Sequence, residues 1–185
     1  MICRKSDPNS GVRCAALLAE NKTLILPTDT VYGFSTVADE AGAKRIRRIK
    51  GRDENKPFIR LIAKPDAIFS FTSCAVPESL LKLWPGALTL IVPSDAEHCG
   101  SVALRCPGDA WLRDVIEAVG KPIFSTSVNR SGKAVLSNIE EILREFTDDV
   151  SLIVDDGDKT NALPSTIVKF DGNMTVIRQG AVRID

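Results

Sequence analysis

Short apolar runs rich in β-branched residues recur along this chain, and the stretches between them carry apolar residues at helical spacing. The expected strands cover residues 23–26, 58–62, 88–92, 102–105, 123–125, 152–154, 166–170 and 174–177. The expected helices cover roughly residues 11–20, 40–50, 77–83, 109–119 and 138–146. Because strands and helices alternate, the sequence predicts an α/β fold, with a mixed sheet and flanking helices.

Two local signals refine this outline. Ser137 precedes Glu140 by three residues, so we expect a capping box in which Ser137 caps the last helix and Glu140 reaches back to the Ser137 amide. Asp-Gly-Asn at 171–173 separates the last two strands and predicts a hairpin. Residues 155–165 have no periodic pattern and predict a mobile loop.

Composition limits the classes of protein to consider. The 185 residues are 44% hydrophobic, which fits a single domain over residues 1–185 with one core. Lys plus Arg and Asp plus Glu balance at 24 each, so attraction of nucleic acid or membrane requires local clustering. The five cysteines form no Cys-x-x-Cys pair, which argues against a zinc site and favours a reducing cytoplasm. The longest apolar runs are too short to cross a bilayer, so no membrane contact is expected.

Polar side chains gather where the apolar strands end. "PTDTVYG" (27–33) follows the first expected strand, and "IFSTSVNRSG" (123–132) runs from an apolar strand into hydroxyls. Ligands of open α/β sheets bind at strand ends, so these segments are candidates for one site. The first segment equally fits an Asx or Ser/Thr turn closed by Gly33.

Cations also lie at candidate strand and helix ends. Arg105 closes an apolar strand, which suggests a clamp for a carboxylate or a phosphate. The helix at 40–50 buries Ile46 and Ile49, and most of its cations are expected only to solvate it. Three cations lie at and beyond the end of this helix: Lys50, Arg52 and Lys56. They can converge on one point, or they can simply interact with the helix dipole.

Two familiar active sites do not fit the sequence. A P-loop ending in Gly132-Lys133 would need glycine at Ser127 and a hydroxyl at Ala134. A serine hydrolase is disfavoured because Ser127 has no G-x-S-x-G frame and nothing ties the one histidine, His98, to a nucleophile. Cations and hydroxyls without an activated nucleophile suit phosphoryl or nucleotidyl transfer.

The motifs "PTDTVYG", "IKGRDENKP", "LWPGALTLIVP", "VALRCP", "STSVNRSG" and "PSTIV" occur in the order seen in the YrdC family, which the chain resembles from about residue 12 to residue 180. It is similar to the short, single-domain members. The resemblance implies a twisted α/β fold with a concave, locally positive cavity. It also implies a nucleotidyltransferase that makes threonylcarbamoyl adenylate and pyrophosphate from L-threonine, bicarbonate and ATP. The product then serves threonylcarbamoyladenosine formation in tRNA, through downstream threonylcarbamoyl transferase proteins.

The resemblance also implies roles for individual residues. The catalytic K-x-R and S-x-N signatures fall on Lys50, Arg52, Ser127 and Asn129. The implied ATP-binding residues are Arg52, Lys56, Ser101, Ser127 and Arg178. The implied threonine-binding residues are Thr28, Thr30, Arg105, Ser125 and Ser165. No metal-ligating residue is implied, and Mg2+ is expected to accompany ATP.

Some positions depart from the family pattern. Arg130 replaces a common leucine and is expected to add a cation beside the nucleotide site. Leu61 stands where longer members have a histidine that contacts threonine, which bears on amino-acid selectivity. Two other functions stay open: an RNA-binding or ribosome-associated module that uses the same basic cavity, and carbamoyl transfer within a larger system. Zero net charge and 5% aromatic residues disfavour the RNA-binding module.

Overall fold

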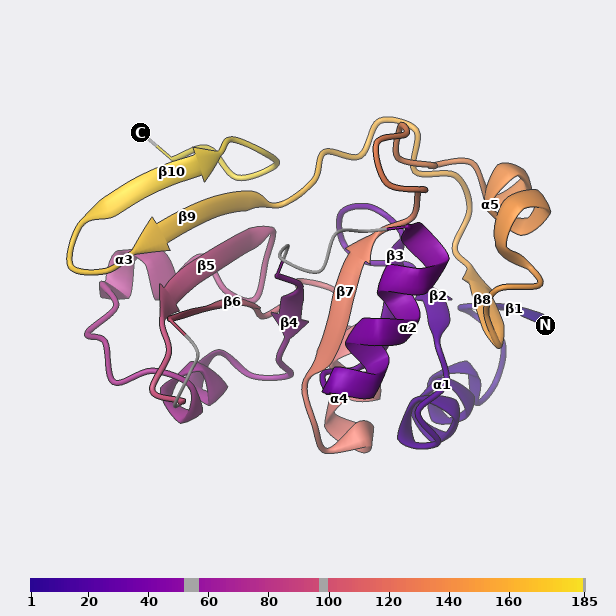
Figure 1. Cartoon of the computed structure of the whole chain (residues 1–185), viewed down its shortest axis with the longest axis horizontal. Coiled ribbons are helices and arrows are strands. Elements are labelled where there is room, and N and C mark those ends of the chain that lie inside the picture. Colours follow the sequence, from indigo (N-terminus) through magenta and orange to yellow (C-terminus); the bar gives the residue numbers. More distant parts are fainter. Residues whose placement is uncertain (52–56, 97–99, 185) are drawn as a thin grey trace.

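The computed structural model describes residues 1–51, 57–96 and 100–184. Within these ranges one ten-stranded sheet has the strand order β1-β8-β2-β3-β7-β4-β6-β5-β9-β10 (Figure 1). The strands are β1 (Ile2–Arg4), β2 (Leu24–Leu26), β3 (Gly33–Val37), β4 (Ile59–Leu61), β5 (Leu88–Pro93), β6 (Ser101–Arg105), β7 (Ile123–Ser127), β8 (Leu152–Asp155), β9 (Thr166–Phe170) and β10 (Met174–Arg178). The helices are α1 (Ser10–Ala19), α2 (Glu40–Lys50), α3 (Glu78–Leu81), α4 (Ala110–Val119), α5 (Ile139–Phe146) and the 3-10 segment η1 (Pro65–Ser70).

The sheet is mixed, as predicted. Four strand pairs are parallel, namely β1 with β8, β2 with β8, β4 with β6, and β5 with β9. The remaining pairs are antiparallel and include the predicted hairpin of β9 and β10 around residues 171–173. Every expected strand and helix is present. Within the described residues β1, β3 and η1 are additional elements that the sequence pattern did not predict.

Alternation along the strands supplies two faces for helices to cover. Leu24 and Leu26 of β2 pack with α1 and α4, whereas Ile25 between them packs with α2 and α5. Leu152 and Val154 of β8 repeat this division. The middle of the sheet therefore has a helical layer on each face (Figure 1). A third apolar cluster fills the end formed by β5, β6, η1 and α3.

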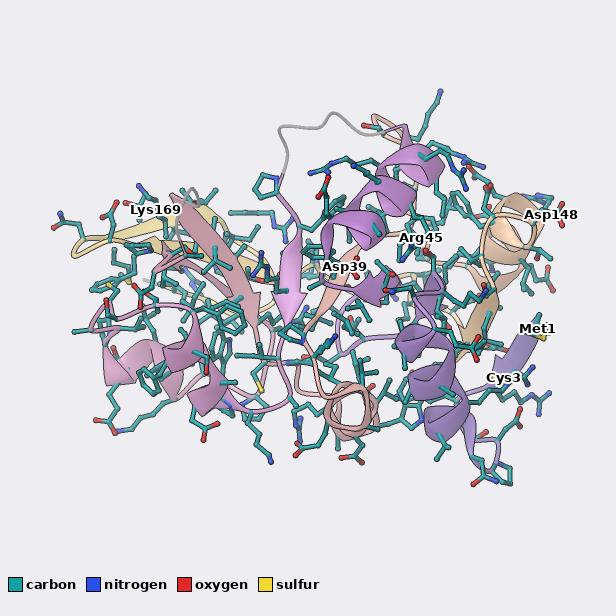
Figure 2. All side chains as sticks on the ribbon, turned by 60° about the horizontal axis from the view of Figure 1, so that its bottom comes forward. Met1, Cys3, Asp39, Arg45, Asp148 and Lys169 are labelled. Atoms are coloured by element: carbon teal, nitrogen blue, oxygen red, sulfur yellow. The ribbon has the colours of Figure 1, made fainter. Side chains whose placement is uncertain are left out.

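The two ends of helix α2 are fixed by side-chain and backbone caps. The Asp39 carboxylate accepts the Gly42 N–H at 2.6 Å, and Gly51 ends the helix in the left-handed region at φ 62°. Figure 2 shows Asp39 at the start of this helix and Arg45 along it. Ile46 and Ile49 are buried as predicted. Arg45 is more than a solvating charge, because it is half-buried and its Nη2 donates to the Thr36 hydroxyl.

The predicted capping box of α5 is wrong. The N-cap is Asn138, whose side chain accepts the Glu141 N–H at 3.1 Å, and not Ser137. Asp158 contributes a second acceptor, because its Oδ1 takes the Ile139 N–H at 3.0 Å. Helix α5 therefore begins one residue later than a Ser137 cap requires, with a carboxylate from the following loop at its start.

None of the helices in the described ranges combines the length and apolar character that crossing a membrane requires.

Candidate functional site

A cavity of about 340 Å³ lies over β4, β5, β6, β7 and β9. Its floor is a row of residues that pair across neighbouring strands. Ser125 on β7 pairs with Ile59 on β4, Ile59 pairs with Ala103 on β6, and Ala103 pairs with Ile91 on β5. Because side chains alternate between faces along a strand, residues two positions away lie on the same face. Leu61, Arg105, Ser127 and Thr89 therefore surround this row. The β2–β3 loop, Ser165 and Arg178 supply the walls.

Arg105 is almost fully buried and is held by three acceptors. Its Nε donates to the Gly86 carbonyl at 3.0 Å, its Nη1 to the Thr30 hydroxyl at 2.9 Å and its Nη2 to the Asp29 carboxylate at 2.6 Å. The other oxygen of Asp29 accepts the Gly108 N–H at 2.9 Å. Burial lowers the pKa of Arg105, and the Asp29 charge opposes that change. The guanidinium is thus fixed and charge-compensated by the protein itself.

Thr28 and Thr30 form the turn that follows β2. Their hydroxyl oxygens lie 2.9 Å apart, and Thr28 Oγ1 accepts the Thr30 N–H at 3.0 Å and donates to the Val31 carbonyl at 2.8 Å. Both residues are buried and line the cavity. The two interpretations of this segment, a Ser/Thr turn and a binding wall, are therefore compatible, because the turn fixes the hydroxyls that face the cavity.

Gly33 does not close this turn. It opens β3, and a Cβ at its position would lie 2.5 Å from the Ser125 hydroxyl oxygen. A side chain at residue 33 would displace the Ser125 hydroxyl, because β3 passes so close to Ser125 that only a hydrogen fits between them without a shift.

Arg178 lies on the opposite wall, on the edge strand β10. Its Nη2 and Nε donate to the Ser165 carbonyl at 2.7 and 3.2 Å, and the Ser165 hydroxyl is paired with that of Thr89 at 2.8 Å. Burial and the neighbouring charge of Arg105 lower the pKa of Arg178. Within the described residues no carboxylate pairs with Arg178, so it carries the uncompensated positive charge of the cavity wall.

The K-x-R and S-x-N signatures meet beside the cavity. Lys50, at the end of α2, is almost fully buried. Its Nζ donates to the carbonyls of Ser127 and Asn129 and, at 2.8 Å, to Asn129 Oδ1. The Ser127 hydroxyl also donates to Asn129 Oδ1, at 2.9 Å. Lys50 thus forms one hydrogen-bond cluster with two residues, Ser127 and Asn129, that lie 77 and 79 positions further along the sequence.

Most of the predicted site residues converge on the cavity. The residues that line it are Thr28, Thr30, Arg105, Ser125, Ser127, Ser165 and Arg178. Lys50 and Asn129 lie directly behind Ser127. Ser101 is exposed at the far end of β6 and is not among the described residues that line the cavity. Arg52, Lys56 and His98 lie outside the described residues.

Arg130, which was expected to add a cation, is charge-paired within the protein. It pairs with Glu145 and Asp149 on and after α5, and its guanidinium lies 4.6 Å from the centre of the Phe146 ring. Its Nη1 also donates to the carbonyl of Ile49. The expectation is therefore corrected: Arg130 connects the segment after β7 to α2 and α5.

Three contributors were missed by sequence reasoning. Thr89 holds Ser165, Asp29 holds Arg105, and the Tyr32 hydroxyl accepts the Asp156 N–H and donates to the Gly157 carbonyl at 2.8 and 2.7 Å. A lone threonine inside the apolar run "LTLIV" was the available signal for Thr89. The other two contacts join segments whose pairing the sequence does not specify.

Comparisons with known proteins find a matching family model, similar sequences and similar solved structures. A family model described as telomere recombination, for the Sua5, YciO and YrdC proteins, matches residues 16–180. The threonylcarbamoyl-AMP synthase of Bacillus subtilis is 31% identical over 92% of this chain, and the human protein of that name is 31% identical over 89%. The matched regions are 53% and 65% of those relatives, so the chain spans between half and two thirds of their length. The structure of P. abyssi Sua5 complexed with L-threonine superposes with a TM-score of 0.86 at 28% identity, covering 97% of this chain and 57% of that one.

Proposed function

Because this chain belongs to the Sua5, YciO and YrdC family, we propose that it makes threonylcarbamoyl adenylate and pyrophosphate from L-threonine, bicarbonate and ATP. The names of its relatives and the threonine complex of a structural neighbour support this reaction. The observation that carries the proposal is a single cavity in which a hydroxyl-rich wall with two arginines adjoins the Lys50, Ser127 and Asn129 cluster.

Threonine occupies the end of the cavity near the β2–β3 loop in this proposal. Its carboxylate pairs with Arg105, since guanidinium groups bind carboxylates well. The hydroxyls of Thr28, Thr30, Ser125 and Ser165 surround its polar groups. The apolar side chains of Ile59 and Leu61 leave a wall suited to its methyl group.

ATP occupies the neighbouring part of the cavity, with Ser127 and Arg178 beside its phosphates. Arg52, Lys56 and Ser101 stay predictions from the family motifs. The neutral threonine amine bonds to the carbon of carbon dioxide and releases one proton to water, or it bonds to the carbon of bicarbonate while a C–O bond breaks and the hydroxide leaves as water with the amine proton. Either route gives an N-carboxy anion. An oxygen of that anion bonds to the α-phosphorus as the bond to pyrophosphate breaks. Each charge-assisted contact realised only in the transition state contributes about 1.5–3 kcal/mol, or about ten- to a hundredfold in rate.

Magnesium enters the proposal only with the nucleotide. Among the described residues no three carboxylate, histidine or cysteine side chains converge to hold a metal ion. Mg2+ commonly binds through substrate phosphates with few protein ligands. The proposal therefore brings Mg2+ to the cavity bound to the phosphates of ATP, with no ligand assigned among the described residues.

We also propose that residues 1–185 act as one catalytic unit in the cytoplasm. Its product is a mixed anhydride that hydrolyses readily, so a threonylcarbamoyl transferase acting on tRNA would have to receive it promptly.

Pyrophosphate release by the purified protein tests the function. With ATP, Mg2+ and bicarbonate we expect release that depends on L-threonine and is much weaker with L-serine. Ser125→Ala should raise the threonine KM about tenfold, whereas Arg144→Ala, on the exposed side of α5, should behave as wild type. Absence of release with every amino acid would refute the proposal. RNA affinity that falls steeply with salt would then favour the RNA-binding function.

A further inference from the structure

Lys50 has no hydrogen left for a phosphate. A lysine ammonium carries three N–H donors, and at least three acceptors among the described residues surround Nζ: the carbonyls of Ser127 and Asn129, the latter at 3.0 Å, and Asn129 Oδ1 at 2.8 Å. The side chain is 97% buried, with an exposed fraction of 3%. These three acceptors all belong to the segment that follows β7, and reaching a ligand would require breaking at least one of these bonds.

Asn129 is equally committed. Its Oδ1 accepts from Lys50 and from the Ser127 hydroxyl, and its Nδ2 donates to the carbonyls of Arg130 and Lys133 at 2.9 and 2.8 Å. A side-chain amide has two acceptor sites and two N–H donors, so all four are occupied. This pattern also fixes which end of the amide faces Lys50, because only oxygen can accept from an ammonium.

One backbone hydrogen bond joins α2 to this segment, and another joins two parts of the segment itself. The Ser131 N–H donates to the Lys50 carbonyl at 2.7 Å, and the Leu136 N–H donates to the Val128 carbonyl at 2.8 Å. Lys50 thus holds residues 127–131 from both its side chain and its carbonyl. Among the residues of this cluster only Ser127 lines the cavity.

We propose that Lys50 and Asn129 are positioning residues that hold the turn at residues 127–133 in the shape that ATP binds, and that neither contacts the phosphates. The choice of ATP as the ligand rests on the proposed function. Lys50 affects ATP binding through its hydrogen bonds to Asn129, so substitutions of the two residues should have the same effect. A phosphate ligand at Lys50 would instead act independently of the asparagine amide.

A double-mutant cycle in ATP affinity separates the two roles. We expect Lys50→Met and Asn129→Ala each to raise the Kd for ATP about tenfold, and the double variant to match the more affected single variant within about twofold. If both residues contacted the phosphates independently, their effects on the Kd would multiply and raise it about a hundredfold in the double variant. That result would overturn the proposal.

Hydrogen exchange of the free protein provides a readout that needs no ligand. Lys50→Met should speed exchange of the amides in residues 127–136 at least about tenfold, because their anchor is lost. Lys50→Gln, which keeps two N–H donors without the charge, should restore much of the protection. Arg178→Met is the matched control: it should weaken ATP binding and leave exchange in residues 127–136 unchanged. Unchanged exchange in both Lys50 variants would overturn the proposal.

These outcomes stay distinct from failure of the proposed function. If the wild-type protein binds no ATP, the proposed synthase function fails. The hydrogen-exchange measurement still tests whether Lys50 holds residues 127–136 in place. If Lys50→Met does not fold, the Lys50→Gln and Asn129→Ala variants complete the cycle with the same expected non-additivity.

Discussion

At the scale of single residues, the site is notable for how much of its hydrogen-bonding capacity is used within the protein. Arg105 is compensated by Asp29, which is itself 20% exposed, and the Thr30 hydroxyl already accepts from Arg105. Lys50 is surrounded by carbonyl and amide oxygens. The polar groups of the cavity are therefore fixed before a ligand binds. Among the described lining residues, the guanidinium of Arg178 is the main donor that a ligand's own acceptors would have to match.

Removing the Asp29 charge should make stability depend on threonine. Asp29→Asn leaves the buried Arg105 cation without its counterion, so we expect the free energy of unfolding to fall by about 1–3 kcal/mol. Threonine should then raise the melting temperature more in this variant than in wild type, because its carboxylate replaces the lost charge. Asp148→Asn, on an exposed side chain without a partner in the described residues, is the control. Equal threonine-induced shifts in both proteins would contradict this reading.

Gly33→Ala tests the close approach of β3 to Ser125. The added Cβ would lie 2.5 Å from the Ser125 hydroxyl oxygen, so that side chain must move out of its place in the cavity wall. We expect the threonine KM to rise about tenfold, with the loss of one hydrogen bond as its cause. Steady-state kinetics at saturating ATP would measure it. Gly100→Ala adds a methyl group where no atom lies within 4 Å and should change neither kinetics nor stability.

At the scale of elements, periodicity predicted the α-helices and most strands but missed β1, η1 and the site-forming strand β3. This strand has the sequence GFSTV and is buried throughout, yet it follows a turn-like segment and carries two hydroxyls. Ser35 and Thr36 are fully buried. A pattern that counts hydroxyls as surface residues cannot identify such a strand, because its burial comes from neighbours on both edges, β2 and β7.

The same limit applies to the site. Family motifs indicated Thr28, Thr30, Arg105, Ser125 and Ser165, which the fold brings to one cavity. They did not indicate that Asp29 would pair with Arg105, since that contact depends on how the loop after β2 lies against the end of β6. Motif resemblance thus predicted which residues gather, while the partners that hold them depend on sheet register.

The corrected start of α5 gives a prediction at this scale. Asn138→Ala removes the acceptor of the Glu141 N–H and should lower the free energy of unfolding by about 1 kcal/mol. Ser137→Ala should change it by less than about 0.5 kcal/mol, because the half-buried Ser137 is not the cap of the helix. Urea unfolding of the two variants compares them directly. The reverse order would restore Ser137 as the cap.

At the scale of the whole molecule, the sheet joins segments that are far apart in the chain, and the loop after β8 closes one side of the cavity. Tyr32, next to the β2–β3 turn, holds that loop through its hydroxyl, which bonds to Asp156 and Gly157. Lys159 in the same loop lies 5.7 Å from the centre of the Tyr32 ring. The geometry of the wall therefore depends on a neutral phenol.

This dependence predicts a loss of stability at alkaline pH that belongs to one residue. Burial, with the nearby Asp155, Asp156 and Asp158 charges, raises the pKa of Tyr32 from about 10 to about 12, against the opposing Asp156 N–H. A raised folded-state pKa means that the stabilisation is complete below pH 10 and is lost as pH rises from about 10 to about 12, because only the unfolded chain ionises readily there.

Tyr32→Phe removes this titration together with the two hydrogen bonds. The variant should be less stable than wild type at pH 8, by about 1–3 kcal/mol, and the gap should narrow as pH approaches 11. Denaturant unfolding of both proteins at several pH values measures the gap; a gap that stays constant to pH 11 would mean that the Tyr32 hydroxyl titrates as freely in the folded protein as in the unfolded chain.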